Sequence, residues 1–148
     1  MLMSALPHVL VLNGPNLNFL GRREPQIYGH TTLTDVIDEL RRRYDGTLVI
    51  DHLQSNHEGV LIDRLQAAAE PNLLGVVLNA GAYTHTSVAL RDAVSSIAPL
   101  PVVEVHLSNV QAREDFRHRS LIGAVCRGVI AGFGTDSYRL AVEALRKK

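Results

Sequence analysis

Short apolar runs and amphipathic stretches alternate along this chain. The apolar runs are rich in Val, Leu and Ile and have the length of buried strands. They cover residues 8–14, 47–55, 72–81, 100–109 and 128–134. In the stretches between them, apolar residues recur at the spacing of one helix face. These stretches cover residues 31–44, 57–69, 85–97 and 135–148. The pattern therefore predicts five strands and four helices.

Strands that alternate with helices predict right-handed βαβ units, which place all strands parallel in one sheet. Because the strands are apolar throughout, we expect helices to cover both faces of that sheet. The fold class predicted for the 148 residues is α/β, a flavodoxin-like three-layer sandwich with a five-stranded parallel sheet. We find no internal repeat or linker in the sequence. We therefore expect one catalytic domain over residues 1–148, with residues 1–7 as a disordered N-terminal extension.

The charge balance argues against some classes of function. Lysine plus arginine and aspartate plus glutamate each number 15, so the chain lacks the basic surplus typical of nucleic-acid binding. No apolar run approaches the roughly 18 residues that span a bilayer, and the first residues lack the pattern of a signal peptide. The single cysteine, Cys126, rules out an internal disulfide. We expect a cytoplasmic protein that binds neither nucleic acid nor membrane.

Lysine occurs only at the last two positions, Lys147 and Lys148, and all other basic residues are arginine. Schiff-base chemistry needs a lysine in a pocket, so the sequence argues against an imine mechanism. The chain also contains no dinucleotide fingerprint, P-loop, zinc-helix motif or nucleophile elbow. Cys126 has apolar neighbours and is expected to be a packed thiol. We therefore expect no metal and no cofactor, and the available chemistry is general acid–base catalysis.

The most polar segments follow the first, third and fourth predicted strands. They read NGPNLNFLGRREPQIYG, NAGAYTH and HLSNVQAREDFRHR. In an open parallel sheet, ligands bind beyond the carboxyl ends of the strands, near the point where the strand order reverses. We therefore expect the site to be built from these three segments. Their residue types suit an acid–base enzyme that acts on a small, oxygen-rich, anionic molecule.

Tyr28 and His106 are the candidate base and acid. Guanidinium charge lowers the pKa of a phenol, and Arg23 and Arg113 lie in segments that can approach Tyr28. Glu104 lies two residues before His106 on the same face of a strand, where a carboxylate orients an imidazole and stabilises its charged form. Alternatively, the arginines and the tyrosine are solvated loop residues, and the histidine is a structural residue at a strand end.

Five further polar residues are candidates for binding. Ser108 is expected to cap a short helix, whose first amides would hold a carboxylate or would simply be capped. Asn16 and Asn79 are expected to close the first and third strands. Each of them either binds a hydroxyl or enolate oxygen or holds its own turn. Arg117 and His85 suit contacts to a polyol.

Several blocks of the sequence resemble a single family. In order from about residue 8 to residue 146, they are LNGPNLNFLGRREPQIYG, QSNHEG, NAGAYTHTSVALRDA, EVHLSN with AREDFR, and GVIAGFG with SY. These blocks resemble the type II 3-dehydroquinate dehydratases. The resemblance implies a flavodoxin-like subunit in a homo-dodecamer, arranged as a tetramer of trimers. It also implies a hydro-lyase of the shikimate pathway that converts 3-dehydroquinate reversibly to 3-dehydroshikimate, by anti elimination through an enolate and without an imine.

The same resemblance implies roles for the catalytic residues. Tyr28 would remove the C2 proton as a tyrosinate. Arg23 would keep the phenol ionised, with help from Arg113. His106 would protonate the leaving C1 hydroxyl, and Glu104 would orient His106.

It also implies how the substrate is held. Asn16 would bind a water or the enolate oxygen, in the manner of an oxyanion hole. Ser108 and the backbone amide of Leu107 would bind the carboxylate. Asp92 would reach in from a neighbouring subunit. The ring hydroxyls would be bound by Asn79, His85 and Arg117.

Arg22, Arg23 and Tyr28 look like part of a lid that closes over the substrate. We expect Arg23 rather than Arg22 to be essential, because Arg23 occupies the family position. Phe19 departs from the family pattern, since a leucine is common at that position.

Overall fold

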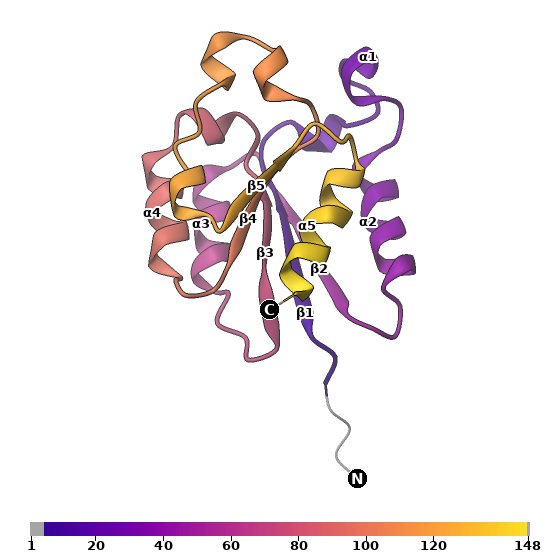
Figure 1. The fold of residues 1–148 in the computed structure, drawn as a ribbon, viewed down its shortest axis with the longest axis vertical. Coiled ribbons are helices and arrows are strands. Elements are labelled where there is room, and N and C mark those ends of the chain that lie inside the picture. The colour runs from indigo at the N-terminus through magenta and orange to yellow at the C-terminus, as the bar shows by residue number, and fades with distance from the viewer. Residues whose placement is uncertain (1–4, 148) are drawn as a thin grey trace.

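A five-stranded parallel sheet forms the centre of the computed structural model, which describes residues 5–147 apart from the side chain of Tyr28 (Figure 1). The strands are β1 (His8–Asn13), β2 (Val49–Gln54), β3 (Leu73–Asn79), β4 (Val102–His106) and β5 (Gly128–Ala131). Their order in the sheet is β2-β1-β3-β4-β5, and every neighbouring pair is parallel. The order reverses at β1 and β3, as in flavodoxin-like domains. The predicted fold class and strand number are confirmed.

Four helices form the outer two layers. α2 (Leu33–Arg43) and α5 (Asp136–Arg146) lie on one face of the sheet, and α3 (Glu58–Gln66) and α4 (Val88–Ser96) lie on the other (Figure 1). All four were predicted, and with the sheet they make the three-layer sandwich. Within residues 5–147, no helix has both the length and the apolar character that a membrane crossing requires.

Short helical turns, which the apolar pattern did not predict, fold the loops. α1 (Pro25–Tyr28) is a single α-helical turn after β1. The described residues also form five 3₁₀ turns: η1 (Leu17–Phe19), η2 (Gly81–His85), η3 (Val110–Ala112), η4 (Asp115–Arg117) and η5 (Gly123–Val125). The segments expected to hold the site are therefore folded into turns rather than extended loops.

The start of α2 is fixed by a capping box. Thr32 Oγ1 accepts a hydrogen bond from the Asp35 backbone N–H, and Asp35 Oδ2 accepts one from the Thr32 backbone N–H, each at 3.1 Å. Two of the donors that a helix N-terminus leaves unpaired are satisfied in this way. Because α2 follows α1 after only a short loop, the capping box also fixes the place where that loop ends.

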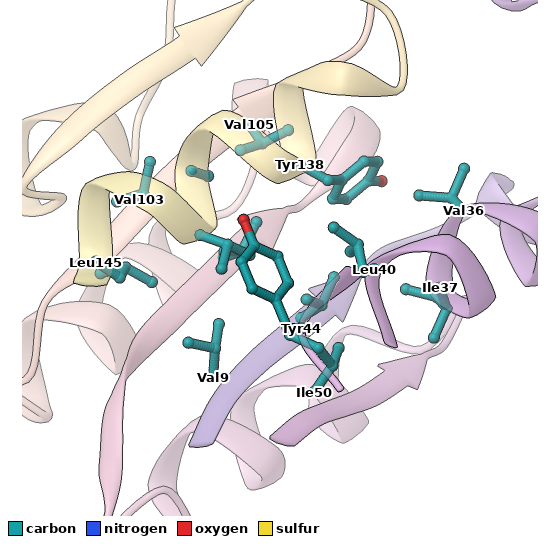
Figure 2. Packing of buried hydrophobic residues seen from close by; sticks show 14 of the residues in the cluster. Val9, Val36, Ile37, Leu40, Tyr44, Ile50, Val103, Val105, Tyr138 and Leu145 are labelled. Atoms are coloured by element: carbon teal, nitrogen blue, oxygen red, sulfur yellow. The ribbon is translucent and has the colours of Figure 1, made fainter. Parts of the chain in front are cut away.

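The core consists of two clusters, one on each face of the sheet. Side chains along β1 alternate between them, since successive residues of a strand point to opposite faces. Val9, which Figure 2 labels, and Val11 pack on the side of α2 and α5, whereas Leu10 and Leu12 pack on the side of α3 and α4. Each fully buried side chain of this size contributes about 1.5–3 kcal/mol to the free energy of unfolding. The side chain of Asn13, at the end of β1, points to the same face of the sheet as those of Val9 and Val11.

The edge strand β5 is less covered than the sequence predicts. Val129 on this strand is 51% exposed, and Phe133 just after it is 63% exposed. The expectation that both faces of the sheet are covered is therefore wrong at β5 within a single chain. β5 has a neighbouring strand on one side only, which leaves it open at the edge.

The described chain begins close to the sheet. The Pro7 carbonyl accepts a hydrogen bond of 2.9 Å from the Val49 backbone N–H. The predicted extension covers residues 1–7. Its residues 1–4 lie outside the described residues, so their expected disorder stays a prediction.

Candidate active site

The carboxyl ends of the central strands form a row of polar residues. Asn13 at the end of β1 pairs in register with Gln54 at the end of β2 and with Asn79 at the end of β3. β4 ends in His106. α1 and the turns after β4 rise above this edge, at the top of Figure 1. A cavity lies at this edge, where the strand order predicts a ligand site.

The cavity is lined by the three segments that the sequence indicated, those after β1, β3 and β4. Most of the predicted site residues lie on its wall: Asn16, Arg23, Asn79, His85, His106, Leu107, Ser108, Arg113 and Arg117. Glu104 contacts His106 from behind. The structure therefore brings together residues that are far apart in the sequence.

Two predicted residues stand apart from this group. Tyr28 ends α1, but its side chain lies outside the described residues, so its place in the site stays a prediction. Asp92 is exposed on α4 and is not on the cavity wall of its own chain. Its expected approach to a neighbouring subunit also stays a prediction.

His106 is held by a buried carboxylate. Its Nε2 lies 2.5 Å from Glu104 Oε2, and Glu104 is only 2% exposed. The other oxygen of Glu104, Oε1, accepts a hydrogen bond of 2.6 Å from the Ser120 hydroxyl. Both carboxylate oxygens are therefore engaged, as a buried charge requires. Because Nε2 faces the carboxylate, Nδ1 is the nitrogen of His106 that can exchange a proton with a ligand.

His85 lies alongside His106 on the cavity wall. The two rings are stacked with their centroids 6.3 Å apart. His85 Nδ1 lies 2.8 Å from the Arg119 carbonyl oxygen, which can only accept a hydrogen bond. Nδ1 therefore carries a proton, and in the tautomer with Nδ1–H the other nitrogen, Nε2, is an acceptor for a ligand hydroxyl.

Three arginines, Arg23, Arg113 and Arg117, make the cavity wall basic. Arg113 Nη1 donates to Ser108 Oγ at 3.4 Å. Arg117 Nε donates to Glu114 Oε1 at 2.8 Å, and this hydrogen bond holds the pKa of Glu114 below its ordinary value. The exposed Glu114 contact adds little to stability, but it orients the guanidinium. A wall of this kind complements an anion with several oxygens.

Residues 21–29, which include α1, are called the lid here. Arg22 and Arg23 differ in position: the Arg22 guanidinium lies 5.2 Å from the centre of the Phe19 ring, whereas Arg23 lies on the cavity wall. This difference supports the expectation that Arg23 is the functional one. Glu24 has left-handed backbone angles, φ 46° and ψ 57°, and its Oε2 lies 3.6 Å from Arg113 Nη2. An ion pair thus links the lid to the segment after β4.

Two local predictions about these segments were wrong. Asn16 does not close the first strand, which ends at Asn13. Pro15 has no N–H to continue the ladder, and the Asn16 backbone N–H donates to Asn56 Oδ1 at 3.0 Å. Ser108 does not cap the turn after β4. That cap is Asn109, whose Oδ1 accepts from the Gln111 backbone N–H at 3.2 Å. Asn16 and Ser108 both line the cavity nonetheless.

Sequence reasoning missed residues that support the wall from behind. Ser120 binds Glu104, and Tyr138 on α5 binds Asn79. No periodic pattern connects these pairs, which are 16 and 59 residues apart in the sequence. The SY pair, Ser137 and Tyr138, stood among the blocks that resemble the family, but its position alone indicated no role.

Cys126 packs among apolar residues, as predicted. Burial, together with the nearby Glu104 charge, raises the pKa of its thiol to about 12. The thiol is therefore neutral at physiological pH and a poor nucleophile. Within residues 5–147, no three or more His, Cys, Asp or Glu side chains are gathered in a way that would hold a metal ion.

Comparison with known proteins gives consistent matches over almost the whole chain. The family model described as Dehydroquinase class II matches residues 7–146. A 3-dehydroquinate dehydratase of Exiguobacterium sp. is 60% identical over 137 residues, covering 93% of this chain and 92% of the relative. One from Rhizobium johnstonii is 56% identical over 139 residues, covering 93% of this chain and 94% of the relative. The crystal structure of a type II dehydroquinase from Butyrivibrio crossotus matches with a TM-score of 0.93 at 42% identity, covering 97% of this chain and 100% of that one.

Proposed function

Because this chain belongs to the class II dehydroquinase family, we propose that it is a hydro-lyase that reversibly converts 3-dehydroquinate to 3-dehydroshikimate. The reaction removes a proton from the carbon next to a ketone and expels a hydroxyl group as water. The observation that carries the proposal is the buried His106–Glu104 pair on the wall of a cavity with three arginines. Such a pair supplies a proton donor, and the arginines suit an anionic substrate.

The acid in this proposal is His106. Its Nδ1 donates a proton to the C1 hydroxyl as the C–O bond breaks, and the group leaves as water. Glu104 holds the ring through Nε2 and so sets its orientation. Ser120 and the pairing of β4 with β3 fix the position of the carboxylate.

The base in this proposal is Tyr28. It removes the C2 proton as a phenolate, and the electron pair of the C–H bond moves toward the ketone oxygen to form an enolate. A phenol has an ordinary pKa of about 10, and each unit by which guanidinium charge lowers it corresponds to about 1.4 kcal/mol. The supporting observations are Arg23 on the cavity wall and Arg113, which reaches the lid through Glu24.

The remaining wall residues bind the substrate. Asn16 holds the enolate oxygen or a water that binds it, while Ser108 and the Leu107 amide bind the carboxylate. The three residues lie on the wall of one cavity, which supports the assignment. The ring hydroxyls are bound by Asn79, His85 and Arg117. His85 supports this part of the proposal most directly, since its ring orientation leaves Nε2 as an acceptor.

Assembly completes the proposal. Asp92 is exposed on α4 and would contribute to the site of a neighbouring subunit in a homo-dodecamer, a tetramer of trimers. The exposed Val129 and Phe133 at β5 are consistent with burial in such an assembly. We place the reaction in the shikimate pathway and the protein in the cytoplasm.

The test is to add 3-dehydroquinate to the purified protein and follow the ultraviolet absorbance of the conjugated enone product. We expect turnover by the wild type and a large loss in His106→Ala. Absence of the enone at high enzyme concentration would contradict the proposed function. Borohydride added with substrate should not inactivate the protein, because the proposed route has no imine to reduce.

A further inference from the structure

A chain of hydrogen bonds runs behind the cavity wall, from Asn79 on β3 to His52 on β2. Asn79 Nδ2 donates to the Tyr138 hydroxyl at 2.9 Å, and that hydroxyl donates to Asn13 Oδ1 at 2.5 Å. Asn13 Nδ2 lies 3.1 Å from His52 Nε2. Asn13 and Tyr138 are completely buried, and Asn79 is nearly so. This series of hydrogen bonds therefore connects one residue of the cavity wall, Asn79, to groups that no ligand in the cavity can touch.

The direction of these bonds follows from the single proton of the Tyr138 hydroxyl. Because Tyr138 donates this proton to Asn13, its oxygen can only accept in the bond with Asn79. Asn79 Oδ1 accepts a bond of 3.2 Å from the Gly81 backbone N–H. Exchanging the oxygen and nitrogen of Asn79 would place two donors against each other at Gly81. The amide is thus held at both ends, in one orientation.

Tyr138 differs in this respect from the other large aromatic residue of the same cluster. Tyr44 and Tyr138 both pack between the sheet and the helices α2 and α5 (Figure 2). The Tyr44 hydroxyl reaches Glu143 on α5 at 2.7 Å, away from the cavity, whereas the Tyr138 hydroxyl contacts only the buried amides. Burying a hydroxyl is unfavourable unless it is paired, and phenylalanine would fill almost the same space. Packing alone therefore does not explain why a tyrosine, with its buried hydroxyl, occupies position 138.

We propose that Tyr138 and Asn13 are positioning residues for the dehydration. They hold the Asn79 amide so that its second N–H and its remaining lone pair are presented to the ring hydroxyls of the substrate. This inference rests on the proposed function, in which Asn79 binds those hydroxyls.

The protonation states of Tyr138 and His52 support this direction. Burial raises the pKa of Tyr138, so the phenol keeps the proton that it donates to Asn13. Burial, with a smaller effect of the Arg41 charge, lowers the pKa of His52. A neutral His52 can accept from Asn13 Nδ2, and the four groups then form one directed series.

The test compares Tyr138→Phe with Tyr44→Phe. Both variants lose one tyrosine hydroxyl from the same cluster, and thermal unfolding shows whether each has folded. For Tyr138→Phe we expect the KM for 3-dehydroquinate to rise about tenfold with a smaller change in kcat, because a misdirected Asn79 loses binding in ground and transition states alike. For Tyr44→Phe we expect both constants within about twofold of wild type. Should Tyr138→Phe not fold, Asn13→Leu removes the acceptor of the Tyr138 proton and is expected to raise KM in the same way.

A double-mutant cycle with Asn79→Ala separates positioning from a general loss of structure. If Tyr138 acts through Asn79, adding Tyr138→Phe to Asn79→Ala changes KM less than about twofold further. An equal KM in Tyr138→Phe and Tyr44→Phe would overturn this inference alone. So would a full tenfold effect that persists in the Asn79→Ala background. A wild-type protein without dehydration would overturn the proposed function and the inference with it.

Discussion

The two sides of the cavity are built in different ways. On one side, His106 ends a strand of the sheet and contacts a buried carboxylate that also accepts from Ser120. On the other side, the lid is a single helical turn between Gly21 and Gly29, with exposed side chains at Arg22, Arg23 and 25–27 and left-handed backbone at Glu24. The His106 side is thus anchored by the sheet and by buried hydrogen bonds. Among the described side chains, the partly exposed ion pair between Glu24 and Arg113 links the lid to the segment after β4.

In the proposed mechanism, this difference separates the group that donates a proton from the segment that covers the substrate. A group that must donate a proton at one fixed point benefits from a rigid strand and a buried partner. A group that must cover the substrate has to move away for entry and release, which short turns and glycines allow. Substitutions of the residues that hold His106 should therefore change the chemical step. Substitutions at Gly21, where the lid begins, should change both substrate binding and turnover.

The largest effect is expected from the residue that the lid is proposed to carry to the substrate. In Tyr28→Phe the base is lost but the ring remains, so we expect kcat to fall by about 10³-fold, within the range of general base catalysis. KM should change only a few-fold, which is the pattern of a group used in the transition state. Steady-state enone formation measures both constants. A kcat close to that of wild type would show that another group removes the proton.

The next largest effect is expected on the acid side. Glu104→Gln keeps the size of the side chain but removes the charge behind His106, and we expect kcat to fall about 10- to 100-fold. Ser120→Ala leaves the Glu104–His106 contact in place, so its loss should be several times smaller. The comparison uses kcat at saturating 3-dehydroquinate, with thermal unfolding to show that both variants are folded. Equal losses in the two variants would mean that the charge itself is not what His106 needs.

A smaller effect is expected at Gly21, where the lid begins. Gly21 has φ +91°, and a Cβ there would lie 2.8 Å from the His30 carbonyl oxygen. Gly21→Ala should therefore displace the lid and lower kcat/KM about tenfold. The matched control is Gly46→Ala, where φ is +74° and a Cβ would meet nothing within 4 Å. Its kcat/KM should equal that of wild type, although both variants lose stability. If Gly46→Ala also lost activity, the loss could not be assigned to the lid.

The sequence predicted the features that depend on near neighbours along the chain, and it missed those that depend on distant contacts. Strands and helices depend on the spacing of near neighbours, so β1 to β5 and the four long helices were predicted from apolar periodicity. Parallel topology then brings the ends of β1, β3 and β4 together, which is why the cavity lies where it was expected. The Glu104–His106 pair was also predictable, because residues two apart on a strand share a face.

The rest depends on contacts that no local pattern records. The Tyr138 hydroxyl meets Asn13 across 125 residues of sequence, and Ser120 meets Glu104 across 16. The cap after β4 is Asn109 and not Ser108, because both residue types cap well and the backbone geometry decides between neighbours. The left-handed backbone at Asn16 and Glu24 follows from the packing of the turns and not from residue type alone.

The smallest effect is expected where α2 supports the end of the lid. Hydrogen bonds from the Thr32 backbone and side chain hold the pKa of Asp35 below its ordinary value. A carboxyl with a lowered pKa in the folded state stabilises the fold above its unfolded pKa, and this stability is lost as pH falls through the folded value. Asp35→Asn should therefore lower the melting temperature by roughly two degrees at neutral pH, and the difference from wild type should vanish in acid. Asp38→Asn, on the same helix but outside the capping box, is the matched control for the loss of one carboxylate from α2. Because Asp35 is not on the cavity wall, kcat/KM should stay within about twofold of wild type. A larger loss of activity in the folded variant would mean that the capping box sets the position of the lid. The first turn of α2 would then act together with the lid and not only as part of the fold.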